Sequence, residues 1–163
     1  MMLRRCLVFA ALLFWHGGAT FYASVVIPVG LNTLQPPRLQ TFVTRTVTLI
    51  LNLSGTVALA LFAWDVAAAR DPRRARRRAR WLTCAGMLLT LLGLVWLHFR
   101  LDRLMDVRTL QIHQPEAIRP LHWTYVGISG LQWLCGTLYA FLTLYAWRAE
   151  EIAKESEPEP LST

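Results

Sequence analysis

Apolar residues dominate four long stretches of the chain, and the charged residues gather between these stretches. A helix needs about 20 apolar residues to cross the roughly 30 Å hydrocarbon core of a bilayer, and each stretch is at least that long. The expected helices cover residues 6–29, 39–69, 72–110 and 121–147. Pro36-Pro37 separates the first two helices, and Pro115 and Pro120 are expected to end the loop before the fourth. The pattern therefore predicts an all-α bundle of four transmembrane helices.

Charge sets the expected orientation of this bundle. The chain has 163 residues, is 55% hydrophobic and carries a net charge of +7, much of it in the run Arg70 to Arg80 (RDPRRARRRAR). Of the 17 Lys and Arg residues, eleven fall on the side of the termini and this run, and six on the other side. The positive-inside rule then predicts an N-in/C-in orientation, with both termini in the cytoplasm. We expect the loop 70–80 to contact anionic lipid headgroups, and expect no nucleic-acid partner.

Residues 1–149 are expected to form a single membrane domain. The acidic, Pro-containing segment 150–163 is too polar to bury a core and is predicted to be a disordered cytoplasmic tail. The N-terminal segment resembles a signal peptide, with an apolar run over residues 7–15 and a weak cleavage pattern at Tyr22-Ala23-Ser24. Apolar residues continue to Pro28, however, so we expect a retained helix.

Polar residues within the spans follow helical spacing, which predicts the helix faces that point into the bundle. The clearest stripe lies on the fourth helix: His122, Tyr125, Ser129, Gln132, Gly136, Tyr139 and Thr143. A matching stripe lies on the second: Thr41, Arg45, Thr48, Asn52 and Gly55. Small residues in such stripes allow helices to pack closely. The longer side chains predict a polar interhelical site that opens outward, formed by Arg45, Asn52, Tyr125 and Gln132.

Several ligands fit this predicted site. Imidazole and carboxylate groups suit transition metals, so His98, Asp102 and His122 form a candidate metal site. A b-type haem needs axial ligands in an apolar pocket, for which His98 and His122, or the deeper His16, are candidates. Alternatively, Asp102 pairs with Arg45 and the polar groups have plain interfacial roles.

Other roles for the whole protein stay open from the sequence. The outward funnel suits a small transporter acting as a homo-oligomer, and the packing stripes suit a non-catalytic subunit or scaffold with a membrane partner. We find no nucleophile–base pair, phosphate-binding loop or paired-carboxylate motif in the sequence, so enzymatic activity is not expected.

The first helix also carries a family resemblance. Residues 15–28 (WHGGATFYASVVIP) resemble the W-x-G-G-x-x-F-x-x-x-V-x-x-P opening of small bacterial four-helix membrane families. These families include uncharacterised ones and, more distantly, copper-resistance D-like and haem-biosynthesis J-like proteins. Residues 43–52, 98–106 and 122–133 extend the similarity over most of the chain. The resemblance implies a four-helix bundle and favours haem or copper as its ligand, and with it we expect a multi-pass protein of the bacterial inner (plasma) membrane.

Overall fold

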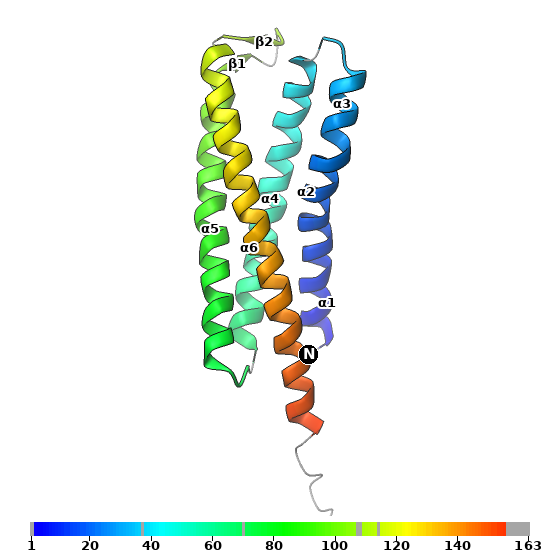
Figure 1. Ribbon diagram of the computed structural model, residues 1–163, viewed down its shortest axis with the longest axis vertical. Coiled ribbons are helices and arrows are strands. Elements are labelled where there is room, and N and C mark those ends of the chain that lie inside the picture. Colours follow the sequence, from blue (N-terminus) through cyan, green and yellow to red (C-terminus); the bar gives the residue numbers. More distant parts are fainter. Residues whose placement is uncertain (1, 37, 70, 107–108, 114, 156–163) are drawn as a thin grey trace, which may run out of the picture.

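The computed structural model is a bundle of four long helices that lie side by side (Figure 1). It describes residues 2–36, 38–69, 71–106, 109–113 and 115–155. The first helix is continuous and consists of α1 (Met2–Ala11), η1 (Leu12–Gly17), α2 (Gly18–Phe21), η2 (Tyr22–Val26) and α3 (Ile27–Thr33). The other three helices are α4 (Arg38–Ala68), α5 (Arg74–Asp102) and α6 (Pro115–Glu155). All four are long and apolar enough to span a membrane, which confirms the predicted fold class.

The first helix is held against α4 and α6 by close approaches at two glycines. A Cβ atom on Gly55 of α4 would lie 2.8 Å from Trp15 Nε1. A Cβ on Gly136 of α6 would lie 3.1 Å from His16 Nδ1 and 3.2 Å from the Trp15 ring. Only glycine leaves room for these rings, as expected for small residues in the two polar stripes. Trp15 is thereby buried in the core beside Phe62.

The π-helical segments η1 and η2 occupy the part of the first helix that carries Trp15, His16 and Tyr22. Such wide turns inside helices are uncommon and are frequent at functional sites. Two of these three side chains, Trp15 and Tyr22, are buried against the bundle. The hydrophobic pattern of the sequence carries no signal for this change of helix type.

The third helix ends at Asp102, so the prediction that it continues to residue 110 was wrong. After a turn, β1 (Met105–Asp106) pairs with β2 (Gln111–Ile112) in a short antiparallel hairpin. The backbone N–H of His113 donates to the carbonyl of Leu104 at 3.0 Å. The backbone groups of these residues are thus hydrogen-bonded across the hairpin, although the leucine spacing alone predicted that they would lie in a helix.

The fourth helix is longer than expected at both ends. It begins at Pro115 and includes Pro120. Pro120 is exposed near the end of the bundle that carries the hairpin, where water can solvate the carbonyl that proline leaves unpaired. It continues to Glu155, so residues 150–155 of the predicted disordered tail are helical. The physical reason is that Glu150 is buried and bound by Arg4 of the first helix. Residues 156–163 of the predicted tail lie outside the described part of the chain.

Asp71 anchors the turn between α4 and α5. Its carboxylate accepts the backbone N–H of Arg73 at 2.9 Å and the Arg76 guanidinium at 2.6 and 2.7 Å. The Asp71 carboxylate thus holds Arg73 just before the helix and Arg76 in its first turn, and the helix begins at Arg74 and not at Pro72. Partial burial alone raises the pKa of Asp71, but the hydrogen bonds from Arg76 and Arg73 outweigh it and hold the pKa below its ordinary value.

We expect a pH-dependent contribution from this contact. Because the pKa of Asp71 is lowered on folding, its stabilising effect is fully present above the ordinary Asp pKa of about 3.9 and is lost as the pH falls through the lowered value. The difference in unfolding free energy between the native chain and Asp71→Asn, about 1 kcal/mol or less at pH 7, should vanish in acid. Thermal unfolding in detergent across a pH series measures it, and a difference that grows as the pH falls would contradict this assignment.

Candidate functional site

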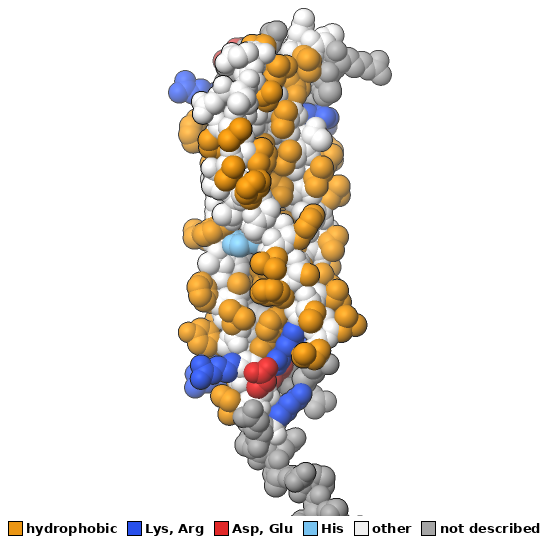
Figure 2. Space-filling view, turned by 90° about the vertical axis from the view of Figure 1, so that its right-hand side faces the viewer, with side chains coloured by type: hydrophobic (Ala, Val, Ile, Leu, Met, Phe, Trp, Pro, Cys, Tyr) orange, Lys and Arg blue, Asp and Glu red, His pale blue; other side chains and the backbone are white. Residues whose placement is uncertain are grey.

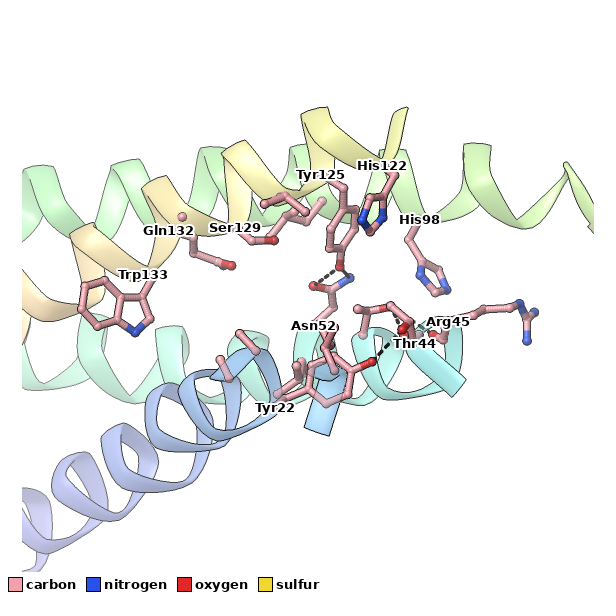
Figure 3. Close-up of a pocket in the computed structure, with 18 of the residues that line it drawn as sticks. Tyr22, Thr44, Arg45, Asn52, His98, His122, Tyr125, Ser129, Gln132 and Trp133 are labelled. Carbon is pink, nitrogen blue, oxygen red and sulfur yellow. Dashed lines mark hydrogen bonds between the residues drawn. The ribbon is translucent and has the colours of Figure 1, made fainter. Parts of the chain in front are cut away.

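A cavity of about 640 Å³ lies between the helices in the half of the bundle that carries the hairpin (Figure 3). All four long helices contribute to its walls. Seven of the eight side chains that the sequence placed in candidate sites line it: His16, Arg45, Asn52, His98, His122, Tyr125 and Gln132. The exception is Asp102, which is bound by Arg45 outside the cavity wall. The polar stripes of α4 and α6 therefore face a shared space.

Two hydrogen-bonded pairs shape the wall of the cavity. Asn52 and Tyr125 join α4 to α6 through contacts of 3.3 and 3.4 Å between the amide and the phenol (Figure 3). The Tyr22 hydroxyl of η2 donates to Thr44 Oγ1 of α4 at 2.8 Å. These pairs hold the polar side chains at fixed positions on otherwise apolar walls.

His98 and Gln132 stand out because they are buried and make no side-chain hydrogen bond to another described residue. Each side chain belongs to a residue that is 7% exposed, and neither makes a hydrogen bond to another described residue. Gln132 points into the cavity from α6, and His98 approaches it from α5 (Figure 3). Neither is among the described side chains whose polar atoms are enclosed without a partner, so these atoms remain accessible to a bound molecule or water. Both are therefore candidate ligand contacts.

His16 lies at the end of the cavity away from the hairpin. Its ring stacks on Trp133 with centroids 5.0 Å apart, and its Nε2 is 3.2 Å from Thr137 Oγ1. Trp133 Nε1 also donates to Thr20 Oγ1 at 2.8 Å. Together these contacts join the first helix to α6 at this end of the cavity. Nδ1 of His16 has no hydrogen-bond partner among the described residues.

The predicted metal ligands are not assembled. Arg45 binds both carboxylate oxygens of Asp102, with Nη2 to Oδ2 at 2.9 Å, which is the ion pair expected from their depth. Within the described residues, no three His, Cys, Asp or Glu side chains converge on a point that could hold a metal ion. His98 and His122 line the cavity, whereas the Asp102 oxygens are occupied by Arg45.

A second polar feature, which the sequence did not predict, lies at the opposite end of the bundle. Asp65 of α4 and Arg80 of α5 are ion-paired and completely buried. Arg4 Nε lies 2.9 Å from Asp65 Oδ1, without hydrogen-bond alignment, and Arg4 Nη2 donates to Glu150 Oε2 at 3.1 Å. The Tyr139 hydroxyl donates to the Phe62 carbonyl at 3.1 Å. We call Arg4, Asp65, Arg80, Tyr139 and Glu150 the inner ionic cluster.

Arg5 extends this cluster to the edge of the bundle. It donates to Glu150 Oε2 at 3.3 Å and to the carbonyl of Trp147 at 3.0 Å, and also pairs with Glu151. Its guanidinium lies 5.5 Å from the Trp147 ring centroid, within cation–π range. The four helices are thus tied together at the end where the cavity is absent.

No family model, curated protein or solved structure matches the chain. The resemblance to copper-resistance D-like and haem-biosynthesis J-like families therefore stays a prediction. The cavity and the inner ionic cluster are the features from which a function can be inferred.

Proposed function

We propose that this chain is a multi-pass protein of the bacterial inner membrane that binds a small molecule in the interhelical cavity. The observation that carries the proposal is the cavity itself, about 640 Å³ in size and lined by all four helices. Ligand sites in proteins are typically apolar pockets of about 300–1,000 Å³ with a few placed polar groups. His98 and Gln132 supply such groups without having protein partners.

The proposed orientation places both termini in the cytoplasm. The N-terminal end of α1, the α4–α5 turn and the end of α6 lie at one end of the bundle, with the hairpin at the other (Figure 1). Figure 2 shows charged side chains near both ends and a belt of hydrophobic side chains between them. The excess of Lys and Arg at the end with the termini favours N-in/C-in, with anionic headgroups at residues 70–80. The cavity then lies in the extracytoplasmic half.

Binding is favoured over transport by the inner ionic cluster. A transported molecule would have to pass between the ends of the helices that this cluster ties together, where Asp65 and Arg80 are fully buried. Transport as a homo-oligomer would use the same outward-facing cavity and would still need a path past this cluster. A scaffold role with a partner subunit would use surfaces outside the cavity, and it does not explain why polar side chains of four helices face an interior space.

Haem b is a second candidate ligand, favoured because three of the four histidines line the cavity. His98 and His122 would hold the iron from α5 and α6. Bound haem would supply one-electron chemistry. The remaining walls are mostly apolar, as a haem pocket requires, with Leu94 and Val126 among the lining residues.

The test is a reduced-minus-oxidised absorption spectrum with metal analysis on detergent-purified protein, before and after addition of haem. If haem binds, His98→Ala and His122→Ala should each lower haem occupancy at least about tenfold, because loss of even an outer-shell partner of a metal site costs about that much. His113→Ala is the matched control, because His113 is exposed on the hairpin and does not line the cavity. An equal loss in all three variants would contradict an axial role for His98 and His122.

A further inference from the structure

We infer that the ligand is an uncharged amphipathic molecule dissolved in the lipid, which enters the cavity sideways between the first helix and α6. This inference rests on the proposed binding function and specifies the class of ligand and its route. Its evidence is the packing of the first helix, the position of the cavity mouth and the charges of the lining residues.

The two helices that flank the mouth separate toward the outer end. Within the first helix, η1 packs against α6, whereas α3 packs against α4. Among the described residues, α2, η2 and α3 have no contact of similar extent with α6. The Trp133–Thr20 hydrogen bond described above joins these helices at the inner limit of the gap. The cavity is therefore open along one side.

Exposed residues on both flanks mark this opening. Ala23 and Ser24 of η2, and Val126 and Gly130 of α6, line the cavity and are also exposed. The neighbouring surface is apolar, with Phe21, Val25 and Trp123 exposed. A mouth within this apolar surface faces lipid, so a molecule can reach it from the bilayer without crossing water.

The charges of the cavity wall select an uncharged ligand. Apart from the histidines, Arg45 is the one described lining residue with a charged side chain. Its guanidinium is bound by Asp102. No other Lys, Arg, Asp or Glu in the described part of the wall can balance a buried anionic or cationic head group. An unpaired charge in such a site is strongly unfavourable. Haem, with two propionates, fits this wall less well than a neutral molecule.

A buried polar group near the outer end selects a head group that accepts hydrogen bonds. His98 carries an N–H group that makes no hydrogen bond to another described residue. We place the head group at His98, and the apolar body extends between Leu51, Leu94 and Val126. Gln132 lies ten residues along α6 from His122, about 15 Å deeper at 1.5 Å per residue, and therefore beyond the reach of that head group.

A benzoquinone with a decyl chain is a suitable probe, because its carbonyls accept hydrogen bonds and the ring quenches tryptophan. Trp15 and Trp133 line the cavity, so binding to the full chain in lipid nanodiscs is measured by saturable quenching. The key variant is Gly130→Phe, which fills the mouth. Gly127→Phe is the matched control, because Gly127 is also exposed on α6 but does not line the cavity. A Cβ on Gly127 or on Gly130 meets nothing within 4 Å.

We expect saturable binding that Gly130→Phe weakens at least about tenfold, that Gly127→Phe changes less than about twofold, and that His98→Ala weakens about tenfold through the lost hydrogen bond. A water-soluble sulfonated benzoquinone should not bind. If haem or the sulfonated probe binds equally well to the native chain and to Gly130→Phe, ligand entry from the lipid is wrong, but the cavity remains a binding site. If the native chain binds none of the probes and does not bind haem, this inference and the proposed function are both wrong.

Discussion

Asp65→Asn should lower the free energy of unfolding by about 3–5 kcal/mol, the range measured when one partner of a buried ion pair is removed. The substitution keeps the shape of the side chain but removes the charge that faces Arg4 and Arg80. Arg80 is fully buried, so its guanidinium would be left in a dry interior without a carboxylate. Unfolding in mixed detergent–SDS micelles measures the loss.

The control is Asp71→Asn, which removes the same charge from a pair with Arg76 in the turn between α4 and α5. That pair lies outside the spans, so the change should be about 1 kcal/mol or less. Combining Asp65→Leu with Arg80→Met should recover part of the loss, because both buried charges disappear together. Equal destabilisation by Asp65→Asn and Asp71→Asn would show that the inner ionic cluster does not hold the bundle closed.

Gly55→Leu should detach the first helix from α4. A Cβ at this position already lies 2.8 Å from Trp15 Nε1, and the Trp15 ring is held on its other side by Gly136. Because Trp15 cannot move without displacing the helix, we expect destabilisation at the upper end of the 1–3 kcal/mol that overpacking usually causes, or more. Loss of thermal stability and faster proteolysis of the N-terminal segment are the measurements.

Gly127→Leu provides the comparison, because a Cβ on Gly127 meets nothing within 4 Å. Replacing glycine there should leave stability unchanged or raise it slightly, since glycine is a weak helix former. A similar loss of stability in both leucine variants would point to a general sensitivity of glycines and not to the Trp15 contact.

The fold and much of the cavity could be predicted because both depend on local periodicity. Four apolar runs identify four helices, and three-four spacing placed Tyr125 and Gln132 on the inward face of α6. Similar depth along their helices also predicted the pairing of Arg45 with Asp102, which is confirmed. Helix faces and depths follow from the chain itself, without knowledge of which helices are neighbours.

The inner ionic cluster was missed because it depends on partners far apart in sequence. Arg4 and Glu150 are 146 residues apart, and periodicity cannot show that their helices end side by side. Asp65 follows no polar stripe, and Arg80 belongs to a run of arginines that the positive-inside rule explains equally well. Helix ends were missed for a related reason: the hairpin after Asp102 is fixed by cross-strand hydrogen bonds that leucine spacing does not reveal.

Native mass spectrometry of the protein released from its own membrane tests the central claim most directly. If the cavity binds a small molecule, the native chain and Gly127→Phe should carry an adduct of one defined mass, and Gly130→Phe should lack it. A chain without an adduct, or the same ladder of lipid masses on all three proteins, would contradict a specific ligand site in the interhelical cavity.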